Sequence, residues 1–217
     1  MKKLIKVNLG CGPVGIKGWI NYDSGVLPLL SKYPKFRHLV CTLGLLPKNY
    51  DVVWPNIELL DIRKKFPLKN DSVDFIYCSQ VLEHFERYET LRILSESLRV
   101  LKPGGIMRIS VPDIAKMLDI YQKLSRTSLD SAAQEINLIW WGYEKDGPAP
   151  SVISKISKLF IRDHQWHYDQ ISMKEILKEV GFSKIKFQGF RKGVTPELKK
   201  LELDLHREHS LYVEVTK

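Results

Sequence analysis

Apolar and polar positions alternate in short runs through the first half of the chain. Runs rich in β-branched and aromatic residues predict strands near Ile5–Leu9, Trp19–Tyr22, Ile57–Leu60, Val73–Cys78 and Ile106–Ser110. Helix signals separate several of these runs, which is typical of a mostly parallel sheet covered by helices. We therefore expect an α/β fold with helices on both faces of the sheet.

The clearest helix signal lies between the fourth and fifth predicted strands. Apolar residues at three- and four-residue spacing form one face of a helix from Tyr88 to Leu101, namely Leu91, Leu94, Leu98 and Leu101. The segment Lys102-Pro103-Gly104-Gly105 then predicts a turn into the next strand.

The last part of the chain predicts one more helix and two closing strands. Ser172 followed by Glu175 has the spacing of a capping box, and Gly181 is a typical helix stop. Alternating positions in Lys184–Gly189 and Leu211–Val215 predict the two strands.

Two regions depart from the simple alternation. Residues 25–55 carry four prolines and predict an insertion, and residues 113–166 predict a helical cap or lid over the sheet. The second region contains Trp140, Trp141 and Tyr143, whose spacing favours core packing over stacking on a ligand. We expect residues 1–217 to form a single domain.

The composition limits the cellular compartment and the kinds of partner to be considered. Three cysteines without C-x-x-C spacing argue against a disulfide framework or a thiolate zinc site, and favour reduced thiols in the cytoplasm. The apolar runs are too short for a transmembrane segment. The net charge of +9 favours an anionic partner, such as nucleic acid, a phosphorylated sugar or an acidic membrane face, but the charge is spread over the chain without a basic block.

A glycine-rich turn follows the first predicted strand. Gly10, Gly12 and Gly15 have the spacing of the dinucleotide-binding fingerprint, in which backbone amides approach a ligand closely. The ribose-binding acid of that motif lies about 20 residues further on, whereas Asp23 comes only 11 positions after Gly12. The spacing leaves little room for a helix and argues against NAD.

Acidic and polar residues follow the next three strands at the same predicted edge of the sheet. The Asp23 carboxylate is suited to accept hydrogen bonds from the two ribose hydroxyls. Asp61 is suited to accept from an adenine amino group while Ile62 packs on the ring, although Asp61 also fits a simple turn cap. Ser79 and Gln80 follow the fourth strand at the edge where open α/β sheets bind ligands. The set favours an adenosine-containing cofactor.

These motifs resemble class I S-adenosylmethionine-dependent methyltransferases. The resemblance is carried by residues 7–12, Asp61, 75–84 and 99–105, in that order and spacing. Residues 18–23, 111–113, 167–169 and 210–214 further resemble a small bacterial and archaeal subgroup of predicted methyltransferases, of the methyltransferase type 11 kind.

The resemblance implies a Rossmann-like, seven-stranded sheet whose last strand is antiparallel. The cofactor, S-adenosylmethionine, would lie across the carboxyl ends of the first four strands. Its methionyl part would face Gly10 and Gly12, and its sulfur would lie near the Ser79-Gln80 segment. Its ribose would contact Asp23, and its adenine would contact Asp61. The full set of expected cofactor contacts is Asn8, Leu9, Gly10, Cys11, Gly12, Asp23, Asp61, Ile62, Ser79 and Gln80. The chain departs from the family in its nearly absent first helix, and from the subgroup at Gln80, where histidine is frequent.

Methyl transfer from a sulfonium depends mainly on alignment of the acceptor, with proton removal when the acceptor is a hydroxyl. The candidate catalytic residues are His84, Asp113 and His167, although His84 also fits a purely structural role. His164 and His167 have the spacing of a metal-binding pair, but Asp163 is the only evident carboxylate beside them. We expect a hydrogen-bonded pair and no metal.

The sequence thus predicts an enzyme that methylates an oxygen or nitrogen of a small-molecule or glycan-type acceptor. An RNA methyltransferase is an alternative because of the +9 charge. A non-catalytic adenosine-binding scaffold is another, since no indispensable base is evident.

Overall fold

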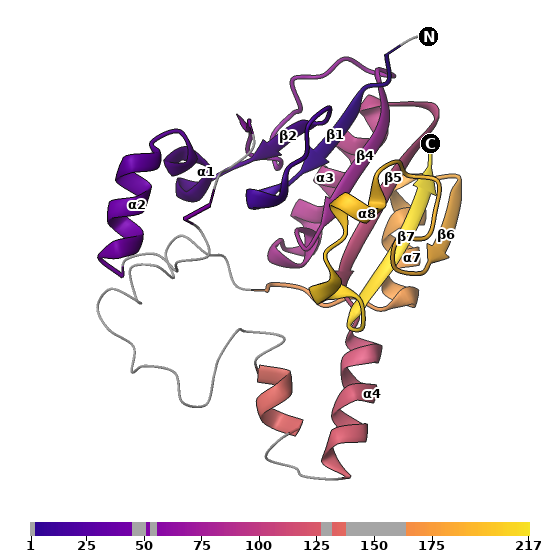
Figure 1. Cartoon of the computed structure of the whole chain (residues 1–217). Coiled ribbons are helices and arrows are strands. Elements are labelled where there is room, and N and C mark those ends of the chain that lie inside the picture. Colours follow the sequence, from indigo (N-terminus) through magenta and orange to yellow (C-terminus); the bar gives the residue numbers. More distant parts are fainter. Residues whose placement is uncertain (1–2, 45–50, 53–55, 127–131, 138–163) are drawn as a thin grey trace.

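Seven strands form one sheet in a computed structural model that describes residues 3–44, 51–52, 56–126, 132–137 and 164–217. The strands lie in the order β3-β2-β1-β4-β5-β7-β6 (Figure 1). β7 runs antiparallel to both of its neighbours, and the other neighbouring pairs are parallel. The expected seven-stranded sheet with an antiparallel last strand is confirmed. The strands are β1 Lys6–Leu9, β2 Ile20–Asp23, β3 Glu58–Leu59, β4 Val73–Ser79, β5 Leu101–Pro112, β6 Lys184–Gln188 and β7 Ser210–Thr216.

Helices lie on both faces of this sheet (Figure 1). The longer helices α3 and α7 cover one face, and the short helix α8 lies on the other. The α-helices are α1 Val26–Ser31, α2 Pro34–Thr42, α3 Arg87–Val100, α4 Ile114–Ser125, α7 Gln170–Val180 and α8 Leu198–Leu201, and residues 132–137 add a short helical segment. The 3-10 helices are η1 Gly12–Val14, η3 Leu82–His84 and η4 Asp204–His206.

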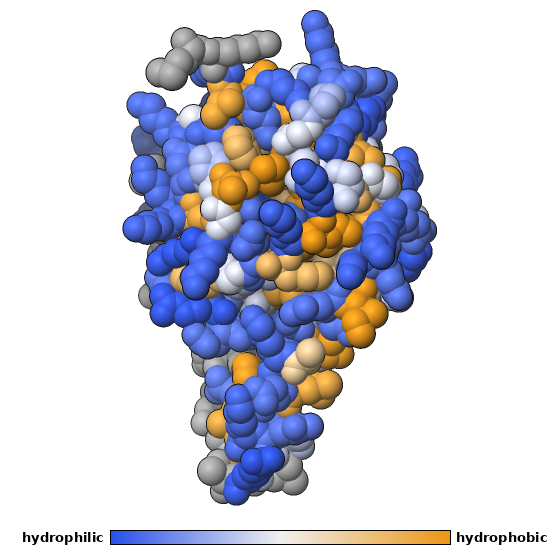
Figure 2. Space-filling view, turned by 90° about the vertical axis from the view of Figure 1, so that its right-hand side faces the viewer, coloured by the Kyte–Doolittle hydropathy of each residue, from blue (hydrophilic) through white to orange (hydrophobic). Residues whose placement is uncertain are grey.

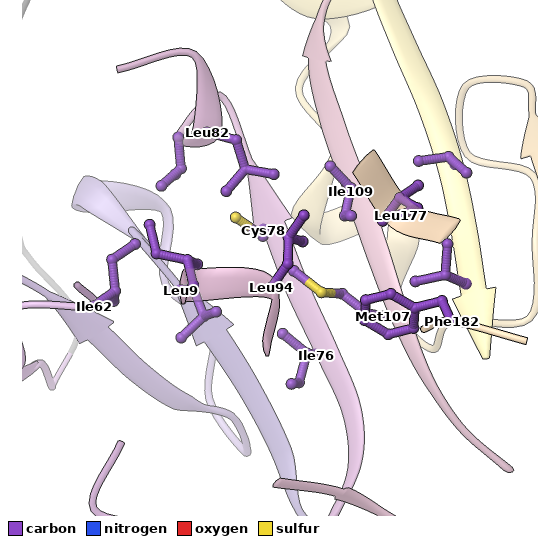
Figure 3. Packing of buried hydrophobic residues seen from close by; sticks show 14 of the residues in the cluster. Leu9, Ile62, Ile76, Cys78, Leu82, Leu94, Met107, Ile109, Leu177 and Phe182 are labelled. Carbon is purple, nitrogen blue, oxygen red and sulfur yellow. The ribbon is translucent and has the colours of Figure 1, made fainter. Parts of the chain in front are cut away.

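The main core lies between the sheet and helices α3 and α7. Because side chains alternate across a strand, Ile76 and Cys78 of β4 face this core while Tyr77 faces the opposite side. Figure 3 shows Leu94 of α3 lying over β4 and β5, close to Met107. The predicted leucine face of α3 is therefore the face that packs on the sheet.

The start of β5 differs from the prediction of a turn at residues 102–105. Val73 pairs with Leu101 and Phe75 pairs with Ile106, so the residues between Leu101 and Ile106 form a bulge within β5. Gly104 adopts a φ of 78°, which glycine tolerates without steric cost. The glycines therefore bend the strand instead of ending it.

The start of α7 is also one turn earlier than predicted. Asp169 is the N-cap, its carboxylate accepts a hydrogen bond from the Ser172 amide at 2.7 Å, and the Ser172 hydroxyl completes the capping box. The predicted box of Ser172 and Glu175 is therefore wrong, because the stronger acceptor, Asp169, takes the cap position. Gly181 ends the helix in the left-handed conformation, as predicted.

Replacing Asp169 with alanine is expected to lower the free energy of unfolding by about 1 kcal/mol, the usual cost of a lost N-cap. Glu175→Ala is the matched control, since Glu175 lies inside the helix. We expect its effect to stay within about 0.5 kcal/mol, as for other surface substitutions. Denaturant unfolding of the two variants checks the assignment, and a larger loss in Glu175→Ala than in Asp169→Ala would contradict it.

Three glutamates form hydrogen bonds and ion pairs that hold the segment around α8 on the second face of the sheet. Glu197 accepts hydrogen bonds from Lys6 and Trp19, each at 2.6 Å. Glu214 of β7 accepts from the amides of residues 194 and 195. Glu202 pairs with Arg108 of β5, and both side chains are almost fully buried. Carboxylates from distant parts of the chain thus hold this short segment in place.

One side of the molecule has a predominantly hydrophilic surface (Figure 2). Figure 2, which views the right-hand side of Figure 1, shows small hydrophobic groups interrupted by hydrophilic residues. Its tapered lower end corresponds to α4, which extends beyond the sheet in Figure 1. Among the described helices, none is both long and apolar enough to cross a membrane.

Candidate functional site

A tight glycine turn joins the carboxyl ends of β1 and β2. Gly10 and Gly12 have φ angles of 65° and 49°, in the left-handed region that favours glycine. The amides of Gly10 and Cys11 donate to the carbonyl oxygen of Tyr22, at 2.8 and 3.1 Å. η1, which follows, spans only three residues. The expectation that a full first helix has no room here is confirmed.

Asp23 closes this turn from the end of β2. Its Oδ2 accepts from the Gly12 amide at 2.6 Å, and its Oδ1 accepts from the Ser24 amide at 2.7 Å. Burial raises the pKa of Asp23, although these two hydrogen bonds act in the opposite direction. Each carboxylate oxygen has two lone pairs, so each keeps one for a further donor. The carboxylate is therefore suited to accept hydrogen bonds from two neighbouring hydroxyls.

Replacing Gly10 with alanine is expected to cost about 1–2 kcal/mol more stability than replacing Gly12. Both substitutions force a left-handed φ on alanine, but a Cβ at Gly10 would also overlap the Cγ2 atom of Val81, while a Cβ at Gly12 meets nothing within 4 Å. Denaturant unfolding measures the difference. The double variant Gly10→Ala with Val81→Ala is expected to regain part of it, and equal losses in both single variants would contradict this packing.

Asp61 and Ile62 follow β3 in different environments. The Asp61 carboxylate accepts two hydrogen bonds from the Arg63 guanidinium, each at 2.9 Å, and this pairing lowers the pKa of Asp61. Ile62 is buried in the main core. The carboxylate is thus fixed at the edge next to β2, while the Ile62 side chain packs inward.

Three more of the predicted cofactor contacts have buried side chains. Leu9 belongs to the main core, and Asn8 donates to the Asn21 side chain at 3.4 Å on the opposite face. Cys11 is buried under the glycine turn, and burial raises its pKa to about 12. Because these side chains are buried, only the backbone of the three residues is placed to contact a ligand at this edge.

Ser79 and Gln80 lie where β4 ends. Gln80 has a φ of 54°, a strained conformation for a residue with a side chain, and such strain is typical of functional sites. Its side-chain amide donates to the hydroxyls of Ser110 on β5 and Ser210 on β7, at 3.3 and 3.2 Å. The sequence analysis gave these two serines no role. Ser110 ends one predicted strand and Ser210 directly precedes another, and these positions could have indicated them.

The histidine candidates gather beside η3. His84 ends η3, and its ring lies 4.9 Å from that of His164 between centroids. His167 follows at 6.3 Å from His164, and partial burial lowers the pKa of His167. The adjacent Glu83 is 1% exposed, and burial raises its pKa to about 8. The sequence analysis missed this carboxylate, which is distant in sequence from His164.

Asp113 follows β5 and caps α4. Its carboxylate accepts from the Ala115 amide at 3.1 Å, and burial raises its pKa. Asp113 also forms a parallel bridge with Tyr168, whose hydroxyl donates to Thr90 in the core. Asp113 therefore joins the start of α4 to the segment that holds His164 and His167.

Several predictions lie outside the described residues. They concern Trp140, Trp141, Tyr143 and Asp163. Of the expected cap over residues 113–166, the structure describes residues 113–126, 132–137 and 164–166.

Residues 42–109 match the family model of a methyltransferase domain. The matched region includes Asp61 and the strand that leads to Ser79 and Gln80, but begins after the glycine turn and Asp23. No curated protein matches the chain.

The solved structures that the chain matches include a Thermotoga maritima S-adenosylmethionine-dependent methyltransferase described as a possible histamine N-methyltransferase. It is 17% identical, with 100% of this chain and 84% of that chain covered and a TM-score of 0.49. A methyltransferase from Mesorhizobium loti is 19% identical, with 99% and 91% covered and a TM-score of 0.49. One from Archaeoglobus fulgidus is 14% identical, with 99% and 86% covered and the same TM-score.

The strand order is the one that the sequence motifs imply, and about a third of the chain matches a methyltransferase domain. The carboxyl ends of β1 to β4, where the turn, Asp23, Asp61 and Gln80 lie, form the candidate cofactor edge.

Proposed function

We propose that this protein transfers the methyl group of S-adenosylmethionine to an oxygen or nitrogen of a small-molecule or glycan-type acceptor. The observation that carries the proposal is the glycine turn closed by Asp23, each of whose two oxygens keeps a lone pair for a further donor. The proposal takes this edge as the cofactor site and residues 113–166 as the acceptor cap.

The cofactor would be held mainly by backbone groups and carboxylates. The glycine turn admits the methionyl part because a Cβ is absent at Gly10 and Gly12, and Asp23 accepts from the ribose hydroxyls. Asp61 accepts from the adenine amino group while Arg63 keeps the carboxylate oriented. Gln80, which has a strained backbone and a side-chain amide held by two serines, bounds the region near the sulfur.

The transfer itself requires alignment of the acceptor atom with the methyl–sulfur bond. A hydroxyl acceptor must also lose its proton. We assign proton removal to His167, because a neutral imidazole can accept a proton, and partial burial lowers the pKa of His167 and so favours its neutral form. Asp113 acts as a positioning residue, since its carboxylate already caps α4.

The direct test is transfer of a labelled methyl group from S-adenosylmethionine to a panel of small hydroxyl and amine compounds, glycans and RNA. We expect product with a small-molecule or glycan acceptor. His167→Asn is expected to lower kcat at unchanged affinity for the cofactor. Cofactor binding without transfer to any acceptor would favour the non-catalytic scaffold instead.

A second candidate function, methylation of RNA, is favoured by a basic hollow between the loop after β3 and α3. Arg63, Lys64, Lys65 and Arg92 line this hollow. Contacts to phosphates would make RNA binding fall steeply with salt concentration. A filter-binding titration at several salt concentrations tests this reading, and no salt-dependent RNA binding would remove it.

We also propose a cytoplasmic location, based on the cysteines. All three are buried and form no disulfide with one another, as expected for a reducing compartment.

A further inference from the structure

Three potential metal ligands come together beside η3 from two distant parts of the chain. Glu83 and His84 belong to η3, and His164 lies in the segment that leads to α7. One ligand atom from each of them lies within 4.8 Å of the other two. The sequence did not predict a metal site because it offered His164 no suitable carboxylate at short range.

Backbone contacts fix the two segments against each other. The amides of Gln165 and Trp166 both donate to the Glu83 carbonyl oxygen, at 2.7 and 3.1 Å. Directly before these residues, His164 meets the ring of His84 edge to face, with an interplanar angle of 66°. The approach of the three side chains is therefore built into the backbone.

Burial and an unpaired oxygen make the Glu83 carboxylate a candidate ligand for a cation. The residue is 1% exposed, and its Oε2 has no hydrogen-bond partner among the described residues. No lysine or arginine of the described part of the chain forms an ion pair with it. Backbone hydrogen bonds from Val81 and Glu83 stabilise the carboxylate in part. Proteins usually pair a buried charged group fully or use it to coordinate a metal.

The donor set fits a first-row transition metal. Two imidazoles and one carboxylate are the ligands of many zinc sites, in which a fourth position holds water or substrate. Ligand bonds of about 2.1 Å place tetrahedral ligand atoms about 3.4 Å apart. The observed separations require an adjustment of roughly 1 Å, which the partly exposed His164 can supply from its loop.

We propose that Glu83, His84 and His164 bind one divalent transition-metal ion, such as Zn²⁺, and leave one coordination position open. The ion would join η3, at the end of the β4 edge, to the segment before α7. The proposal rests on the three side chains and does not depend on the proposed methyl transfer.

The test uses the untagged full chain after dialysis against a chelator. Calorimetric titration with Zn²⁺ is expected to give one ion per chain, and titration with Co²⁺ to give visible absorption bands of a nitrogen- and oxygen-ligated ion. His164→Asn and Glu83→Gln are each expected to weaken Zn²⁺ binding at least about 100-fold, since even loss of an outer-shell partner can cost 10–100-fold.

His38→Asn is the matched control. His38 is an exposed histidine of α2 that pairs with Asp51, and its replacement is expected to leave Zn²⁺ affinity unchanged. Circular dichroism without metal checks that each variant folds. If Glu83→Gln does not fold, the His164→Asn variant alone tests the metal site. His164 lies outside the helices and strands, so we expect this variant to fold.

The proposal is overturned if the wild-type chain binds no stoichiometric Zn²⁺, or if His164→Asn binds it as tightly as wild type. A Co²⁺ spectrum dominated by thiolate charge transfer would also overturn it, because the ion would then lie at the cysteines.

Discussion

Replacing Arg108 with methionine is expected to lower the free energy of unfolding by about 4 kcal/mol, within the range for breaking a buried ion pair. Arg108 donates to Glu202 at 2.8 Å and to the carbonyl oxygens of Lys192 and Gly189 at 2.9 and 3.0 Å. The variant leaves the Glu202 carboxylate buried, with its strongest counter-charge removed. Burial already raises the pKa of Glu202 in the presence of Arg108.

Denaturant unfolding of this variant is compared with that of Arg191→Ala. Arg191 also bonds to the Glu202 carbonyl oxygen, but it is partly exposed, so we expect a loss of about 1 kcal/mol or less. Combining Arg108→Met with Glu202→Gln is expected to recover part of the stability, because no charge then stays buried. A loss below about 1 kcal/mol in Arg108→Met would contradict the role of this pair.

Replacing Asp23 with alanine is expected to weaken binding of S-adenosylmethionine at least about 100-fold. Two hydrogen bonds to a charged group contribute about 1.5 kcal/mol each, and their sum of about 3 kcal/mol corresponds to this factor. The substitution also removes the acceptor that closes the glycine turn on Gly12. Calorimetric titration of the purified variant measures the change.

Asp74→Ala is the matched control for Asp23→Ala. Asp74 also accepts a backbone amide, that of Ile5, together with the Lys102 ammonium, but it lies near the amino end of β4. We expect a similar cost in stability with unchanged cofactor affinity. Unchanged affinity in Asp23→Ala would show that Asp23 does not contact the ribose.

Much of the fold could be predicted because its signals are local. The strands near Val7 and Ile76 are short runs rich in apolar residues, and the α3 leucines repeat at helical spacing. The glycine turn needs a positive φ at Gly10 and Gly12. Glycine adopts this conformation without steric cost, so the spacing of the glycines predicts the turn from the sequence. The short distance from Gly12 to Asp23 likewise predicted the absence of a full first helix.

The features that could not be predicted depend on contacts between distant residues. Glu202 meets Arg108 across 94 positions, so nothing in the local pattern of either indicates the pair. The approach of Glu83 to His164 likewise depends on how the segment before α7 packs on η3. The wrong prediction of the α7 cap has a local cause. Asp169 and Ser172 are both residue types that favour the N-cap position, so residue type alone does not decide between them.

The central claim is that the edge formed by the glycine turn, Asp23 and Asp61 binds S-adenosylmethionine. The most direct measurement is a calorimetric titration of the wild-type chain with S-adenosylmethionine, S-adenosylhomocysteine and NAD in parallel. The account predicts binding of both sulfur compounds and none of NAD. Binding of NAD, or of neither sulfur compound, would contradict it.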